Sequence, residues 1–276
     1  MNNKKAILKL IGIIFIGVVL KVIQLPFLED PLAKVFHLRM IKNVATTPFA
    51  LILIILSYLF FSIIFIKIQG RINGNKIYKG LIYGTLFGLL WFFGVIEMGI
   101  IHSNSIKQDI LYGLGDALPL IVMGILLGMF FGSSSKNQVS KKDVMPIIGI
   151  TLIYSVGRYI SYIVIGAQSS YIVKPIETLA LTLVNGLLIS ILYYFVKDAL
   201  QHYRLVKRAF VFGFIIFGID WFLYNLFIPL IYDISLLQTV QSFLGRSIPD
   251  VLYACIGVFY SEKVRVSKNN KLEFRK

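Results

Sequence analysis

Residues 48–67 read PFALILIILSYLFFSIIFIK, with one charged side chain at the very end. A helix of about 20 mostly apolar residues, rising about 1.5 Å per residue, matches the thickness of the hydrocarbon core of a bilayer. Seven further stretches approach this length and composition, at roughly 6–23, 79–101, 113–132, 144–166, 175–197, 209–232 and 247–262. We therefore expect an all-α polytopic membrane protein with eight transmembrane helices.

The composition of the whole chain agrees with this expectation. Of the 276 residues, 57% are hydrophobic and only 15% are charged, and the mean hydropathy is +0.80. Soluble domains carry about 45–50% apolar and about 25% charged residues. The single cysteine, Cys255, excludes an internal disulfide framework, and the three histidines lack metal-ligand spacing. No metal site is expected, and the sequence names no cofactor.

The net charge of +15 has a topological explanation. If both termini are cytoplasmic, the cytoplasmic segments contain 20 Lys and Arg residues and the outer segments contain 7. Basic residues concentrate in cytoplasmic loops, so this asymmetry predicts a multi-pass protein of the cell membrane with both termini inside. The first stretch is followed by Lys21 and Pro26 rather than by a small-residue cleavage site, which indicates an uncleaved helix. Nucleic acid is not expected as a partner.

The two halves of the sequence resemble copies of one unit. At an offset of 137 residues Lys21 aligns with Arg158, and from the second stretch onward, at an offset of 130, Trp91 aligns with Trp221. Four helices per half is an even number, so the copies keep one orientation and form a parallel repeat. The expected domains are a first repeat at 1–132, a linker at 133–143, a second repeat at 144–262 and a basic cytoplasmic tail at 263–276.

Short amphipathic segments are expected on the outer side. Asp30 and Pro31 begin a predicted interfacial helix that continues to about Asn43. The segments 104–112 and 235–244 occupy equivalent places before the fourth and eighth helices. They act either as plain connectors or as lids.

Ionisable side chains inside the apolar stretches are the candidates for function, because burying a charge in a bilayer costs about 2.5–3.5 kcal/mol. The candidates for a substrate or ion pathway are Asp220, Arg158, Asp116, Arg246, Asp250 and Glu97. Counting along the helices places Asp220 roughly 16 Å from the cytoplasmic side, near the midplane, and the others nearer the outer side. This distribution predicts a polar cavity that opens outward and narrows toward Asp220.

Pairings among these residues follow from their spacing and depth. Asp116 and Arg246 occupy equivalent positions with opposite charge, so we expect an ion pair between the halves. Arg158 is the expected partner of Asp220. Two non-functional interpretations remain open: Glu97 is solvated at the membrane interface, and Arg246 pairs with Asp250 one turn along the same helix.

Gly113-Leu114-Gly115-Asp116 resembles the Gly-x-Gly-Asp signature of intramembrane aspartyl proteases such as presenilins and prepilin peptidases. The resemblance implies a pair of carboxylates that share a proton and activate water. It covers four residues, and neither the Tyr-Asp of the preceding helix nor the later Pro-Ala-Leu is present. Glycine at this place alternatively gives a tight entry to the fourth helix.

Three functions remain open. The leading hypothesis is a transporter or permease-like protein that moves a small polar, charged or lipid-headgroup substrate. The second is a non-catalytic accessory or sensor protein that binds a lipid or a membrane partner, and the third is an intramembrane protease-like enzyme. The lipid bilayer is the expected environment, and a membrane protein or an ATPase is a possible partner.

Overall fold

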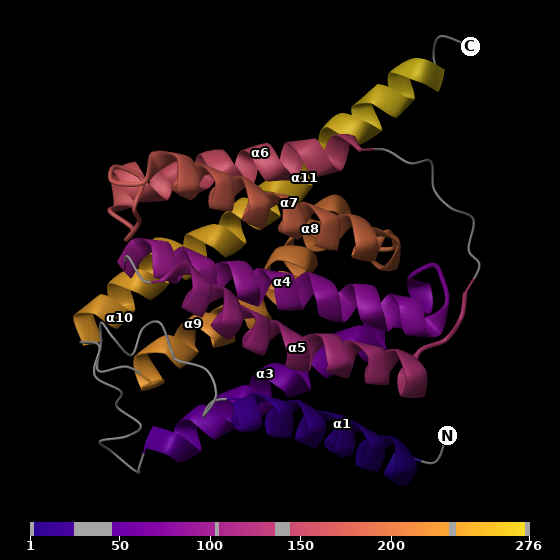
Figure 1. Cartoon of the computed structure of the whole chain (residues 1–276). Coiled ribbons are helices and arrows are strands. Elements are labelled where there is room, and N and C mark those ends of the chain that lie inside the picture. The colour runs from indigo at the N-terminus through magenta and orange to yellow at the C-terminus, as the bar shows by residue number, and fades with distance from the viewer. Residues whose placement is uncertain (1–2, 25–45, 103–104, 136–143, 232–235, 274–276) are drawn as a thin grey trace.

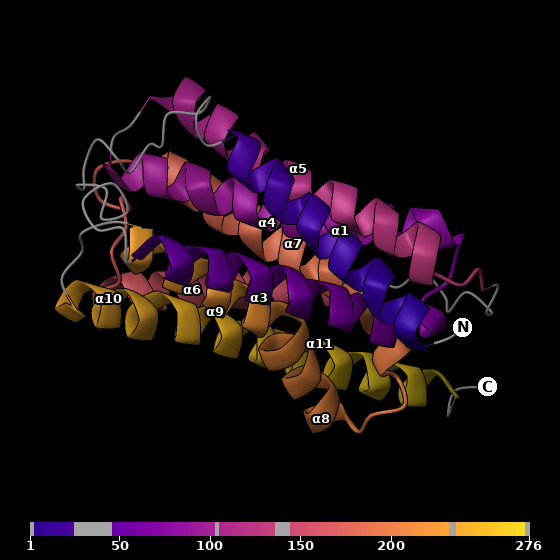
Figure 2. The same ribbon diagram turned by 90° about the horizontal axis from the view of Figure 1, so that it is seen from below.

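The computed structural model describes residues 3–24, 46–102, 105–135, 144–231 and 236–273. Within these ranges the secondary structure is helical, apart from one isolated β-bridge between Gly74 and Ser135. The helices lie side by side in one elongated bundle (Figures 1 and 2). The expected all-α class is confirmed.

The first half of the chain forms four long helices. They are α1 (Asn3–Gln24), α3 (Thr46–Ile68), α4 (Lys76–His102) and α5 (Ile106–Phe131), with the short 3-10 turn η3 (Gln69–Arg71) after α3.

The second half contains α-helices that are joined by π-helical segments. In order, they are α6 (Met145–Ile160), η4 (Ser161–Ile165), α7 (Pro175–Leu200), α8 (Leu205–Phe210), η5 (Val211–Gly218), α9 (Ile219–Ile231), α10 (Leu236–Ser242), η6 (Phe243–Ser247) and α11 (Ile248–Glu273).

Eight helices among the described residues are long and apolar enough to cross a membrane. They are Asn3–Ile23, Pro48–Arg71, Lys76–Ile101, Ile106–Phe131, Met145–Ile165, Pro175–Leu200, Leu205–Leu226 and Val240–Arg265. Each corresponds to one of the eight apolar stretches of the sequence, so their number and order are confirmed. The interfacial helix predicted from Asp30 to Asn43 lies outside the described residues.

The two short segments that were expected on the outer side are continuous with long helices. The segment expected at 104–112 supplies the first turns of α5, which runs without interruption from Ile106. The segment expected at 235–244 supplies α10 and then enters η6 and α11. The interpretation of Gly113 and Gly115 as a tight entry to the fourth helix is wrong, because both lie inside α5.

Local signals explain several helix ends. Asn75 precedes α4, and its side-chain oxygen accepts a hydrogen bond of 2.9 Å from the backbone N–H of Ile77, as an N-cap residue does. Pro175 opens α7, where its missing N–H is not needed. Gly166 ends η4 with φ of +73°, a left-handed conformation that glycine adopts without a steric penalty.

A seam of small residues joins α4 to α5. A Cβ atom added to Gly80, Gly84 or Gly88 would meet the backbone of α5 around Gly124 and Ala117. Glycine therefore lets the two backbones approach more closely than any larger residue would permit. The expectation that the glycine spacing in α4 reflects close helix packing is confirmed.

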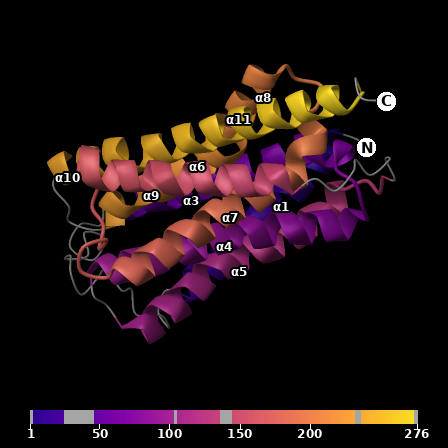
Figure 3. The same cartoon turned by 90° about the horizontal axis from the view of Figure 1, so that it is seen from above.

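Two reciprocal contacts join the halves of the bundle. The second helix of the first half, α3, packs against α9, and the second helix of the second half, α7, packs against α4. Within the halves, α1 packs on α5 and α6 packs on α11. The start of α1 and the end of α11 lie at the same end of the bundle (Figures 2 and 3). We call this the terminal end and the opposite one the distal end.

Candidate functional site

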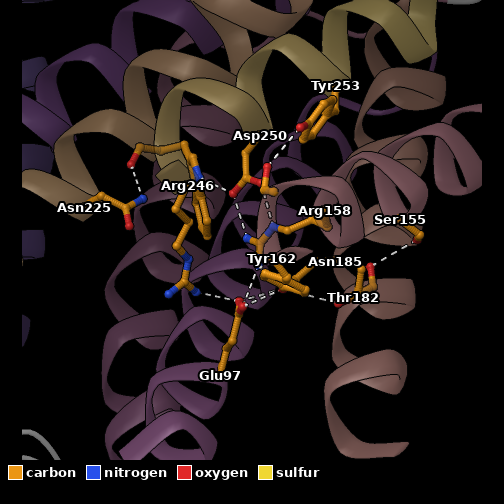
Figure 4. Close-up of polar contacts among 12 residues, drawn as sticks. Glu97, Ser155, Arg158, Tyr162, Thr182, Asn185, Asn225, Arg246, Asp250 and Tyr253 are labelled. Atoms are coloured by element: carbon orange, nitrogen blue, oxygen red, sulfur yellow. Dashed lines mark hydrogen bonds and ion pairs between the residues drawn. The ribbon is translucent and has the colours of Figure 1, made fainter. Parts of the chain in front are cut away.

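A buried network of four charges lies toward the distal end, and Arg158 is its centre (Figure 4). The guanidinium of Arg158, on α6, donates two hydrogen bonds of 2.6 and 2.7 Å to the two carboxylate oxygens of Asp250 on α11. Its remaining nitrogen donates to Glu97 Oε1 at 2.5 Å and to the Tyr162 hydroxyl at 3.0 Å. This planar, two-pronged geometry is the strongest that Arg and a carboxylate form.

Glu97 connects this network to the first half of the chain. It is carried by α4, and its Oε2 lies 2.6 Å from a guanidinium nitrogen of Arg246 in η6. Asn185 of α7 donates a longer hydrogen bond of 3.5 Å to the same oxygen. Glu97 is only 5% exposed, so the interpretation of this residue as solvated at the interface is wrong. Its burial is set by neighbouring helices and not by its depth along α4.

The four charges balance. Glu97 and Asp250 carry two negative charges, Arg158 and Arg246 carry two positive charges, and all four side chains are buried. Removing charges from water costs several kcal/mol per ion, and only good geometry with mutual pairing offsets that cost. Asp250 Oδ2 also accepts a 3.0 Å hydrogen bond from the indole of Trp221. The network therefore satisfies its own charges without solvent.

A separate buried pair lies in the first half. The ammonium of Lys21, on α1, contacts Asp116 Oδ1, on α5, and lies over the ring of Tyr112. The expected pair between Asp116 and Arg246 is therefore wrong. Each residue is bound to another charge instead, because α5 packs directly on α1, whereas Arg246 faces Glu97.

Asp220 differs from the other five candidates. It lies in the first turn of α9, is 3% exposed, and accepts a 2.8 Å hydrogen bond from the indole Nε1 of Trp91 on its Oδ2. Its other oxygen has no hydrogen-bond partner, and no ion pair reaches it among the described residues. The predicted pairing of Asp220 with Arg158 is wrong, because the guanidinium nitrogens of Arg158 are occupied by Asp250, Glu97 and Tyr162.

Four aromatic rings form a connected series that reaches Asp220 through Trp91. Trp91 stacks against Tyr58 of α3 at 6.5 Å between ring centroids, and it contacts Tyr224 of α9 in a tilted arrangement at 5.1 Å. Tyr224 in turn stacks on Trp221 at 5.5 Å. The hydroxyl of the fully buried Tyr58 has no hydrogen-bond partner among the described residues. We call Asp220, Tyr58, Trp91, Trp221 and Tyr224 the Asp220 site.

The arrangement limits the chemistry that the candidates support. Glu97 and Asp250 both contact Arg158, so they do not form the proton-sharing pair of carboxylates that an aspartyl protease needs. Asp116, the aspartate of the tetrapeptide, is paired with Lys21. In the part of the chain that the structure describes, no group of three or more His, Cys, Asp or Glu side chains is arranged to hold a metal ion.

Several residues of the site were not identified from the sequence. Tyr162, Asn185 and Tyr58 are ordinary helix residues in the sequence, and their roles depend on how the helices are rotated. The pairing of Lys21 with Asp116, in contrast, could have been inferred from the alignment of the two halves of the sequence. Lys21 aligns with Arg158, and in both halves the base on the first helix pairs with an acid on the fourth helix.

Comparison of the chain with protein-family models, with curated proteins and with solved structures gives no match. The function must therefore be argued from the residues themselves.

Proposed function

We propose that this chain is an integral membrane protein made of two parallel four-helix repeats, 1–132 and 144–262, and that it transports a small charged substrate. The eight long apolar helices support the membrane assignment. Both termini are proposed to be cytoplasmic, on the distribution of Lys and Arg between the loops.

Reciprocal helix contacts support the repeat. If each half has the helix order one to four, the contact of α3 with α9 joins the second helix of one half to the third helix of the other. The contact of α7 with α4 is the same contact with the halves exchanged. A two-fold axis along the membrane normal generates this pattern, and many transporters are built from repeats of this kind.

The observation that carries the transport proposal is Asp220. A carboxylate in the middle of a membrane bundle is costly, and such residues mark ion or substrate pathways unless another charge neutralises them. Each of the other five candidates has an oppositely charged partner. Asp220 has none among the described residues, and it lies where α9 of one half meets Trp91 of the other. Substrate and coupling ions bind at this kind of interface.

In the described conformation the six candidates are buried, with Arg246 the most exposed at 7%. The candidates therefore do not line the open outer cavity that the sequence predicts. Transport requires the halves to separate at the distal end, where Glu97 holds them together through Arg158 and Arg246.

An accessory or sensor protein is the second candidate. The observation that favours it is the mutual pairing of four charges, Glu97, Arg158, Asp250 and Arg246. Such pairing is expected in a helix bundle that admits no water and keeps one conformation. Such a protein leaves Asp220 without access to water, whereas a transporter exposes it in turn to each side of the membrane.

Solvent access at the repeat interface separates the two candidates. Leu90 precedes Trp91, aligns with Asp220 in the repeat, and is 1% exposed. In a Cys255→Ala background, we expect Leu90→Cys to react with a small, charged thiol reagent applied to either face of membrane vesicles. Leu120→Cys, equally buried but inside the first half, is the matched control and should not react. Absence of labelling at position 90 from both faces would refute transport.

A further inference from the structure

We infer that the Asp220 site binds a monovalent organic cation, such as a quaternary ammonium group. The inference rests on the proposed transport function and names the class of substrate. It follows from three properties of the site: a negative charge without an ion-pair partner among the described residues, two buried oxygen atoms (Asp220 Oδ1 and the Tyr58 hydroxyl) without hydrogen-bond partners among them, and a connected series of aromatic rings.

The charge of the site selects for a cation. Asp220 receives one hydrogen bond, from Trp91, and its Oδ1 has no hydrogen-bond partner among the described residues. A buried carboxylate is stabilised by a proton or by a bound cation, and it repels an anionic substrate. The unpartnered hydroxyl of Tyr58 is a second buried oxygen in the same site. Most buried polar atoms in folded proteins have a hydrogen-bond partner, so these two oxygens are available to a ligand.

The rings favour an organic cation over a metal ion. A Ca²⁺ or Mg²⁺ ion needs about six or more oxygen ligands, and the side chains of the Asp220 site offer few. Four aromatic side chains of the site, Tyr58, Trp91, Trp221 and Tyr224, are instead connected through ring contacts. The faces of such rings attract alkylammonium groups, and cages of this composition bind choline and methylated lysine.

The positions of the rings suit a site that opens and closes. Tyr58 belongs to α3 and Trp91 to α4, whereas Trp221 and Tyr224 belong to α9. Trp91 of the first half thus contacts Tyr224 of the second half and also donates a hydrogen bond to Asp220. When the halves separate, the ring contact of Trp91 with Tyr224 is lost and a cation can take the place of one ring against the other.

The protein carries its own reporter for binding. Its only two tryptophans, Trp91 and Trp221, both belong to the Asp220 site. We propose titrating the full-length protein in mild detergent with choline and recording tryptophan emission. The control ligand is 3,3-dimethylbutan-1-ol, a neutral molecule of nearly the same shape, and sodium chloride controls for ionic strength.

We expect choline to change the emission saturably, and the neutral analogue to bind at least about tenfold more weakly, since tenfold corresponds to about 1.4 kcal/mol for the lost charge interaction. Asp220→Asn should weaken choline binding by a similar factor. Asp198→Asn, an equivalent change at the end of α7, should leave it unchanged.

The two proposals fail separately. If Leu90→Cys is labelled from both faces but choline produces no saturable change, transport stands and the cation assignment is overturned. Equal binding of choline and of the neutral analogue also overturns it, and this comparison uses the unmodified protein and does not depend on how Asp220→Asn folds. If neither labelling nor binding is found, the transport proposal falls as well.

Discussion

Glu97 is the residue whose loss should most affect the joining of the two halves. Glu97→Gln keeps the shape of the side chain but removes its charge. Arg158 retains Asp250, at 2.6 and 2.7 Å, whereas Arg246 loses the carboxylate that lies 2.6 Å away. The variant therefore leaves one uncompensated positive charge in a buried place.

The size of the effect follows from this charge balance. Removing one member of a buried ion pair costs about 3–5 kcal/mol, because the remaining charge stays buried without a partner. For a chain of this size each kcal/mol corresponds to roughly 2–4 °C in the unfolding midpoint, so we expect a loss of about 6–20 °C. The midpoint is measured in detergent from the tryptophan emission or from the monodisperse fraction after heating.

A double variant restores the balance. Glu97→Gln combined with Arg246→Gln removes one charge of each sign, so the double variant should be more stable than the sum of the two single effects predicts. Glu177→Gln is the matched control, because Glu177 is an exposed residue at the start of α7. If Glu97→Gln is as well tolerated as Glu177→Gln, or if the two single effects simply add, the ion network does not hold the halves together.

Three further predictions concern topology, packing and the uncompensated carboxylate. A cysteine placed in 105–110 should react with an impermeant reagent from outside the cell, and one placed in 136–142 only after permeabilisation; the reverse pattern would overturn the orientation. Gly84→Val should lower stability by about 1–3 kcal/mol, since its Cβ would lie 2.5 Å from the carbonyl oxygen of Leu120, whereas Gly12→Ala, with open space around it, should be neutral in the same thermal assay. Asp220→Asn should keep the thermal midpoint while abolishing cation-dependent activity, and a collapse of the fold would show that the carboxylate is structural.

The elements of the fold were predictable because hydropathy is a local property. The eight apolar stretches and the close packing at Gly80, Gly84 and Gly88 were identified correctly from their own residues. A run of about 20 apolar residues forms a helix in a bilayer whatever its neighbours are, since the backbone must satisfy its hydrogen bonds internally.

The pairings were not predictable in the same way, because they depend on the rotation and contacts of helices. Depth along a helix placed Asp116 opposite Arg246, but α1 packs on α5 and brings Lys21 to Asp116 first. Likewise Glu97 lies near the end of α4, yet two arginines from the second half bury it. Comparing Lys21 with Arg158, which align between the two halves of the sequence, would have suggested the correct pattern of base and acid.

The π-helical segments make us expect that the helices of the two halves differ in how easily they bend. All three of them, η4, η5 and η6, belong to the second half among the described residues, and they lie within the first, third and fourth helices of that half. Helices kink at π-helical turns. The glycine seam, in contrast, packs α4 and α5 of the first half closely together. Under the transport proposal, we therefore expect the first half to stay fixed and the second half to move against it by bending at its π turns.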